Sequence, residues 1–182
     1  MQNDIYNDGK YLQRNPTWHA EDSAWKAQKI AEILKANNIN PSSISEIGCG
    51  AGEILRHLNS LLGENIEFCG YEISPQAYEI CKLKKAENLE FHLKDLLQED
   101  GVKYDVVMAI DVLEHIEDYF GFLRALRSKG TYQVFHIPLD LSVQTVLRCS
   151  PISNARKSVG HIHYFTKETA LATLQDTGYE VL

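Results

Sequence analysis

The sequence lacks two features that would each indicate a class of partner. It has no apolar run as long as a membrane-spanning helix, and residues 1–4 show neither the basic region nor the apolar core of a secretory signal. Positive charge is also scarce: 18 lysines and arginines face 25 aspartates and glutamates, which gives a net charge of −7. Such a charge disfavours broad binding to nucleic acid or to an anionic membrane. We therefore expect neither as a partner.

Cysteine is scarce as well, and the four cysteines show no C-x-x-C or other metal-binding spacing. Cys49 and Cys69 fall in predicted strands, where small buried thiols are common. Unpaired thiols of this kind are typical of a reducing compartment. We therefore expect a cytoplasmic protein, and we expect its site to hold no metal.

One stretch organises the chain, because a short strand at 44–47 runs directly into a turn rich in glycine. Gly48, Gly50 and Gly52 make up this turn, and apolar residues at helical spacing follow it. Glycine permits positive φ and removes the Cβ atoms that would hold a ligand away from the backbone. The first amides of the helix then face the ligand with the positive end of the helix dipole. The stretch predicts a site for a nucleotide-type cofactor.

The spacing of these glycines indicates what kind of cofactor. Dinucleotide-binding folds use G-x-G-x-x-G beneath a pyrophosphate, whereas this turn reads G-x-G-x-G and follows an acidic residue, Glu46. A carboxylate at that place suits a ligand with an ammonium or sulfonium group better than one with two phosphates. The spacing therefore disfavours a nicotinamide-dependent reductase.

Further strands and helices alternate along the chain. Strands are predicted at 66–72, 89–94, 104–110 and 131–137, and helices at 21–38, after Gly52, after Ser74 and at 119–128. This alternation predicts an α/β fold, a Rossmann-like doubly wound parallel sheet. Ligands bind at the carboxyl ends of such strands, where the chain places Gly48, Glu72, Asp95, Asp111 and the segment after 137.

These residues carry a resemblance to a known family. The run from Glu46 to Gly52 matches the first motif E-x-G-x-G-x-G, and 110–116 (IDVLEHI) and 160–166 (GHIHYFT) match later motifs. The chain resembles the class I S-adenosylmethionine-dependent methyltransferases of the bacterial small-molecule type over residues 21–182. The resemblance implies transfer of a methyl group from S-adenosylmethionine to an oxygen or nitrogen atom of a small-molecule acceptor, with S-adenosylhomocysteine as product.

The resemblance also implies the roles of individual residues. Glu46 and the backbone at Gly48 would face the amino acid part of the cofactor, Glu72 would hold the ribose, and Asp95 would accept from the adenine amine. The implied cofactor-binding residues are Glu46, Gly48, Cys49, Gly50, Gly52, Glu72, Ile73, Asp95, Leu96, Ile110 and Asp111.

The chain departs from the family at its end. The family sheet usually has seven strands, but here 178–182 is where a sixth strand would begin. A fifth strand left as a bare edge would invite pairing with another chain. Either the last strands are missing through truncation, which we favour, or a partner or a rearrangement covers the edge.

We expect one domain over residues 1–182. Residues 1–20 would form a flap or a tail, 21–137 the cofactor-binding core, and 138–165, which begins with a short amphipathic helix, the acceptor pocket. Because a general base assists methyl transfer, His115, His161 and His163 are the candidate catalytic residues. His161 and His163 would share a face in an extended segment. His136 would point either into the sheet packing, which we favour, or towards the mouth of the site.

Two other functions stay open. A metal-dependent methyltransferase of RNA 3′ ends would use Asp111, Glu114, His115 and His163, although a further motif typical of that family is absent. A module that binds the cofactor without turnover would carry the same glycine turn.

Overall fold

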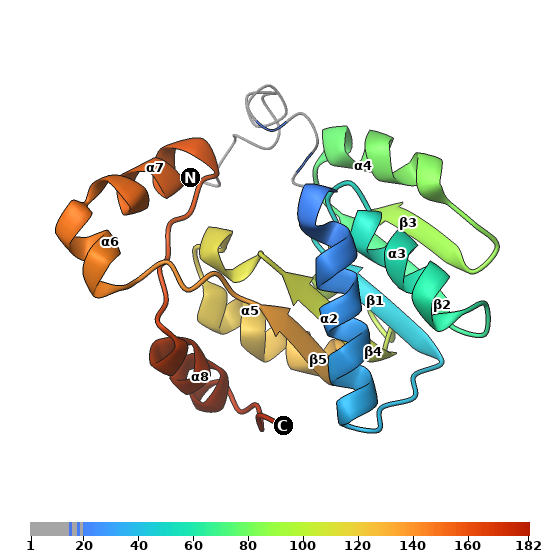
Figure 1. The fold of residues 1–182 in the computed structure, drawn as a ribbon. Coiled ribbons are helices and arrows are strands. Elements are labelled where there is room, and N and C mark those ends of the chain that lie inside the picture. Colours follow the sequence, from blue (N-terminus) through green and yellow to red (C-terminus); the bar gives the residue numbers. More distant parts are fainter. Residues whose placement is uncertain (1–14, 16–17, 19) are drawn as a thin grey trace.

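The computed structural model describes residue 15, residue 18 and residues 20–182. Of the expected flap or tail, 1–20, the greater part therefore lies outside the described residues. Within the described part, five parallel strands form a sheet of order β3-β2-β1-β4-β5 (Figure 1). The strands are β1 (Ser43–Ile47), β2 (Glu67–Glu72), β3 (Leu89–Leu93), β4 (Tyr104–Ile110) and β5 (Gly130–His136).

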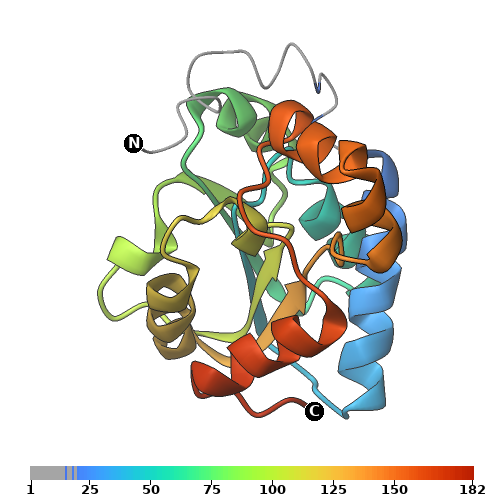
Figure 2. The same cartoon turned by 90° about the vertical axis from the view of Figure 1, so that its left-hand side faces the viewer.

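Helices cover both faces of this sheet, and Figure 2 shows α2 and α5 on opposite sides of it. The helices are α2 (Ser23–Ala36), α3 (Glu53–Leu62), α4 (Pro75–Cys81), α5 (Tyr119–Leu126), α6 (Val143–Arg148), α7 (Ser150–Ser158) and α8 (Lys167–Asp176). Short 3-10 turns are η2 (Ala20–Asp22), η3 (Lys82–Lys84), η4 (Leu96–Gln98), η5 (Leu113–His115) and η6 (Arg127–Lys129).

The two faces of the sheet bury separate apolar clusters. One cluster joins the sheet to α2, α3 and α4, and the other joins it to α5 and α8. Strand β4 contributes to both, since Val106 and Met108 face one cluster while Val107 and Ala109 face the other, all fully buried. A strand covered on both faces needs apolar side chains in both directions. The nearly continuous apolar run of 104–110 therefore predicted this position correctly.

The observed sheet confirms the predicted Rossmann-like parallel fold. Chain order reverses between β1 and β4, which are neighbours: Ile47 pairs with Ala109. Such a switch point leaves a crevice outside the carboxyl ends of the two strands. The glycine turn follows β1, and Asp111 follows β4, so both lie at this crevice.

The expectation that the last strands of the family sheet are lacking is confirmed for the described residues, since 178–182 form no strand: Tyr179 packs its ring on Phe135 and donates a 2.7 Å hydrogen bond to the carbonyl of Leu123. One local prediction was wrong. The segment after 138 holds two helices rather than one, because Cys149 adopts a positive φ that separates α6 from α7. Neither helix buries a residue, and Figure 1 shows them as an outlying pair.

None of the helices in the described part of the chain combines the length and the apolarity that a bilayer crossing requires.

Candidate functional site

A cavity of about 520 Å³ lies at the carboxyl ends of β1, β2, β4 and β5. Among the described residues, most of its polar lining comes from acidic side chains and histidines, with one lysine. These side chains are Asp22, Lys26, Glu46, Glu53, Glu72, Asp111, Glu114, His115, His136 and His161. The predicted site residues Gly48, Cys49, Gly50, Ile73 and Ile110 also line it.

The glycine turn has the backbone that its sequence predicts. Gly48, Gly50 and Gly52 have φ of 69°, 53° and 75°, in the left-handed region that favours glycine. The amides of Gly48 and Cys49 donate to the carbonyl of Tyr71 at 2.8 and 3.1 Å. These bonds tie the turn to β2 and hold the amides of the following helix toward the cavity.

The third glycine has a different role from the first two. Gly48 and Gly50 line the cavity, whereas Gly52 does not. A Cβ atom on Gly52 would lie 2.6 Å from the Phe91 ring and 2.9 Å from the Cβ of Cys81. Gly52 therefore allows α3 to pack closely on the sheet.

The indole of Trp18 lies over the turn. It lines the cavity, and a Cβ atom on Gly50 would lie 2.7 Å from its Cδ1 atom. Trp18, a described residue of the expected flap, thus lies against Gly50 of the glycine turn.

Glu72 holds the glycine turn from the neighbouring strand. Its Oε2 accepts from the amide of Gly50 at 2.8 Å, and its Oε1 accepts from the amide of Ser74 at 2.7 Å. Burial raises the pKa of Glu72, and the backbone amides oppose this shift. Each carboxylate oxygen can accept a second hydrogen bond, so the side chain can also bind a ligand hydroxyl.

Glu46 faces the cavity from the end of β1. Its side chain is buried, and its Oε2 has no hydrogen-bond partner among the described residues. Burial and then the nearby charge of Glu72 hold the pKa of Glu46 well above its usual range. A buried carboxyl group without a partner is costly, and a ligand cation next to it would remove that cost.

Lys26, Asp111 and His136 form a second polar group in the cavity wall. Asp111 Oδ2 accepts from Lys26 at 2.6 Å, and Asp111 Oδ1 lies 2.5 Å from His136 Nδ1. Burial opposes the charged form of each partner, but the contacts outweigh it, so the pKa of Lys26 is raised and that of Asp111 is lowered. Of the two orientations considered for His136, the structure shows the one toward the site, because its ring lies in the cavity wall; the favoured orientation, into the sheet packing, was wrong.

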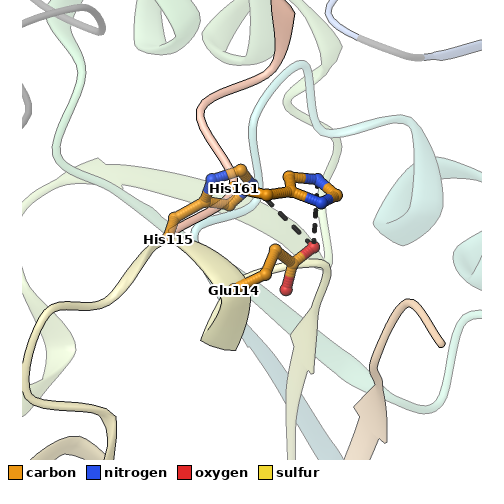
Figure 3. A group of neighbouring side chains, drawn as sticks. All are labelled: Glu114, His115 and His161. Carbon is orange, nitrogen blue, oxygen red and sulfur yellow. Dashed lines mark ion pairs between the residues drawn. The ribbon is translucent and has the colours of Figure 1, made fainter. Parts of the chain in front are cut away.

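A third group consists of Glu114, His115 and His161 (Figure 3). The Nε2 atoms of His115 and His161 lie 3.8 and 3.9 Å from Glu114 Oε1. The Glu114 side chain is 1% exposed, and burial raises its pKa to about 8, with the charges of Asp111 and Asp140 adding to the effect.

Besides Gly52, three predicted site residues lie outside the cavity lining. His163 contacts the carbonyl of Ile116 through Nε2 at 2.9 Å and packs on the ring of Tyr119. Asp95 caps η4, and Leu96 is fully buried in the core. Roles for Asp95 and Leu96 toward an adenine stay predictions. The metal set Asp111, Glu114, His115 and His163 is not assembled, because His163 points elsewhere.

Sequence reasoning missed several residues of the site. Lys26 precedes every predicted strand, and no motif marks it. Asp140, whose Oδ2 lies 2.6 Å from His161 Nδ1, falls in an irregular segment. Glu114 was not missed entirely: the sequence named it, beside His115 in the run after β4, but only for the metal-dependent alternative. Of the expected acceptor segment 138–165, only Pro138, Val159 and His161 line the cavity, among the described residues.

Comparison with known proteins identifies the family. A family model described as a methyltransferase domain matches residues 17–182. The chain belongs to the class I S-adenosylmethionine-dependent methyltransferases. This confirms the resemblance stated from the motifs, and the match covers the glycine turn and every other described residue of the cavity.

Individual relatives of this methyltransferase domain are distant. It is 31% identical over 114 residues to norajmaline N-methyltransferase of Rauvolfia serpentina, covering 55% of this chain and 38% of that protein. It is 23% identical over 123 residues to ubiquinone biosynthesis O-methyltransferase of Vibrio vulnificus, covering 63% and 51%. The chain thus spans about half or less of the length of these curated relatives.

A solved structure shows the same fold. Magnesium protoporphyrin IX methyltransferase from Synechocystis PCC 6803, with bound S-adenosylhomocysteine, superposes with a TM-score of 0.68 at 21% identity. The superposition covers 87% of this chain and 74% of that one. At this identity the likeness establishes the architecture, and the chemistry must be argued from the residues of the cavity.

Proposed function

We propose that the protein transfers a methyl group from S-adenosylmethionine to an oxygen or nitrogen atom of a small molecule. The observation that carries this proposal is the cavity at the switch point, where a bare glycine turn meets the buried Oε2 of Glu46, which has no partner among the described residues. A cofactor with an ammonium and a sulfonium group would offer this oxygen a positively charged partner. The family match agrees with this choice of cofactor.

The cofactor would lie along the glycine turn. Gly48 and Gly50 let it approach the backbone, and Glu72, already bound to two amides, has lone pairs left for ribose hydroxyls. Ile73, which is exposed and lines the cavity beyond Glu72, offers an apolar contact to the adenine side. The indole of Trp18 covers the turn.

The acceptor would enter between the turn and the ends of β4 and β5. Its oxygen or nitrogen attacks the methyl carbon in line, a new bond to that carbon forms, the carbon–sulfur bond breaks, and S-adenosylhomocysteine leaves. Positioning alone can supply effective molarities of about 10⁵–10⁸ M. The acceptor also loses a proton, and two imidazole–carboxylate pairs in the wall can take it: His136 with Asp111, and His161 with Asp140.

Charge and cysteine chemistry support the remaining parts of the proposal. The net charge of −7 and the acidic cavity wall favour a small acceptor over a polyanionic one. The four cysteines are free thiols, three of them buried, which fits a reducing, cytoplasmic location. The relatives named above are an N- and an O-methyltransferase, so the proposal includes both nitrogen and oxygen as acceptor atoms.

Calorimetry with S-adenosylhomocysteine and with NADH tests the cofactor. We expect binding of the first and none of the second. Gly50→Val should abolish binding, since its side chain fills the space over the turn. Gly101→Val is the matched control: Gly101 also has a positive φ, 71°, but a Cβ atom placed on it would meet no atom of the described residues within 4 Å, so valine there adds backbone strain without obstructing the turn.

Two outcomes would contradict the proposal. Equal affinity of Gly50→Val and Gly101→Val for S-adenosylhomocysteine would show that the cofactor does not bind at the turn. Binding without transfer of labelled methyl to any member of a broad panel of phenols, amines and carboxylic acids would instead indicate a module that binds without turnover.

A further inference from the structure

The cluster of Glu114, His115 and His161 contains a buried group that the described part of the chain does not satisfy. The Glu114 side chain is 1% exposed, and neither Oε1 nor Oε2 has a hydrogen-bond partner among the described residues. The two imidazole nitrogens at 3.8 and 3.9 Å are beyond hydrogen-bond distance. Because a buried carboxyl group without a partner is costly, a further group bound between these side chains would stabilise them.

The hydrogen bonds of the two histidines indicate what that group is. His115 Nδ1 lies 3.2 Å from the carbonyl oxygen of Gly160, and His161 Nδ1 lies 2.6 Å from Asp140 Oδ2. Both partners accept hydrogen bonds, so each Nδ1 carries a hydrogen, and in the neutral ring Nε2 then carries a lone pair. Both Nε2 atoms face the same oxygen, Glu114 Oε1, at 3.8 and 3.9 Å, so each can direct a lone pair at a group bound between them (Figure 3).

This arrangement has the features of a metal site. One nitrogen of each imidazole is directed inward while the other binds a carbonyl or a carboxylate, as metal-ligating histidines do. The ligand atoms of all three residues lie within 4.8 Å of one another. In a tetrahedral zinc site with bonds of about 2.1 Å, neighbouring ligand atoms are about 3.4 Å apart. A closure of about 0.5 Å would bring each nitrogen to that distance from the carboxyl oxygen.

The backbone holds the two parts of the cluster together. Glu114 and His115 lie on η5, and His161 lies on the segment after α7. The amides of Ile162 and His163 both donate to the carbonyl oxygen of Glu114, at 2.8 and 3.2 Å. These main-chain bonds hold the segment of His161 next to η5, so the three side chains meet at one place in the cavity.

We propose that Glu114, His115 and His161 bind a divalent transition metal ion, with Asp140 and the carbonyl of Gly160 orienting the two imidazoles. Two nitrogen ligands and one carboxylate suit Zn²⁺, Mn²⁺ or Co²⁺. They do not suit Mg²⁺ or Ca²⁺, which prefer oxygen ligands throughout. Residue spacing alone does not predict this set, because Glu114 and His161 are far apart in the chain.

The cavity supplies the remaining coordination position. All three residues line it, so an ion held by them would face the space between the glycine turn and the strand ends. An acceptor with an oxygen donor would bind to the ion there, a role that rests on the proposed function. His161 would then serve as a metal ligand, and the proton of the acceptor would pass to His136, whose ring Asp111 holds in place.

Metal binding by the full chain, after dialysis against a chelator, tests this proposal. The probes are Zn²⁺ in calorimetry and Co²⁺ in visible absorption, each without cofactor. We expect one strong site per chain. Glu114→Gln, His115→Asn and His161→Asn should each weaken binding more than about 100-fold, and Asp140→Asn about 10–100-fold, as loss of an outer-shell partner does. His92→Asn, a histidine on β3 outside the cavity, is the control and should bind as the wild type does.

Two results would overturn the proposal. One is no stoichiometric Zn²⁺ or Co²⁺ binding by the wild-type chain, a result that needs no variant to fold. The other is a Glu114→Gln variant, folded by circular dichroism, that binds as tightly as the wild type. Calorimetry of S-adenosylhomocysteine with the metal-free chain separates the two proposals, since the glycine turn does not include these ligands. Metal binding without cofactor binding would refute only the proposed function, and cofactor binding without metal binding would refute only this inference.

Discussion

The third glycine of the turn, Gly52, leads to a prediction that separates helix packing from ligand binding. We expect Gly52→Ala to destabilise the fold more than Gly101→Ala does. Both glycines have a positive φ, 75° and 71°, so both variants place alanine in the left-handed region. They differ in their surroundings: a Cβ atom on Gly52 meets the Phe91 ring at 2.6 Å and the Cys81 Cβ at 2.9 Å, whereas one on Gly101 meets no atom of the described residues within 4 Å.

The magnitudes follow from these two situations. Alanine in the left-handed region costs about 1–2 kcal/mol, and this term is common to both variants. Overpacking of a filled core adds about 1–3 kcal/mol, and only the Gly52 variant incurs it. The free energy of unfolding should therefore fall by about 1–3 kcal/mol more in Gly52→Ala.

Urea denaturation followed by circular dichroism measures this difference. With a slope of about 2 kcal/mol per molar urea, the midpoint of Gly52→Ala should lie about 0.5–1.5 M below that of Gly101→Ala. Equal midpoints would refute the reasoning. They would mean that α3 can move away from β3 at little cost and that Gly52 is not required for packing.

Three further predictions concern the carboxylates and one helix cap. Although burial raises the pKa of Asp111, its contacts with His136 and Lys26 lower it overall, so its stabilising effect is present above the unfolded pKa of about 3.9 and is lost as the pH falls through the folded value. The stability difference between wild type and Asp111→Asn, from urea midpoints, should be wide at pH 7 and should narrow progressively as the pH is lowered below about 4. A difference that stays constant over this range would contradict the pairing. Glu72→Gln leaves one carbonyl oxygen for two buried amides and should lower the free energy of unfolding by about 1–3 kcal/mol. An unchanged urea midpoint would show that the glycine turn is stable without these two hydrogen bonds. Thr166→Ala removes the N-cap of α8 and should cost about 1 kcal/mol in thermal unfolding, which an unaltered melting temperature would exclude.

Sequence patterns predicted most of the fold because the patterns are local. A strand buried on both faces must be apolar in nearly every position, as 104–110 is, and a tight turn before a helix needs glycine where φ is positive. Each of these requirements acts within a few residues. The strands, the glycine turn and the family can accordingly be identified from the order of the residues alone.

The histidines were harder to predict, for a physical reason. The expectation that His161 and His163 share a face assumes a regular strand with a period of two residues. The segment has no such regularity: it follows Gly160, whose φ is +85°, and its amides bind the carbonyl of Glu114. His161 therefore faces the cavity while His163 packs on Tyr119.

The sequence by itself determined the parallel sheet, the bare turn at Gly48–Gly52 and the acidic residues at several strand ends. Only the tertiary structure decided which of these carboxyl groups lack a hydrogen-bond partner and which histidine rings lie next to them. Within the described part of the chain, Glu46 Oε2 and both carboxyl oxygens of Glu114 are left without hydrogen-bond partners, while Asp111 is paired with Lys26. These contacts depend on the strand order and on irregular connections that bring distant segments together. Residue spacing along the chain therefore does not predict them.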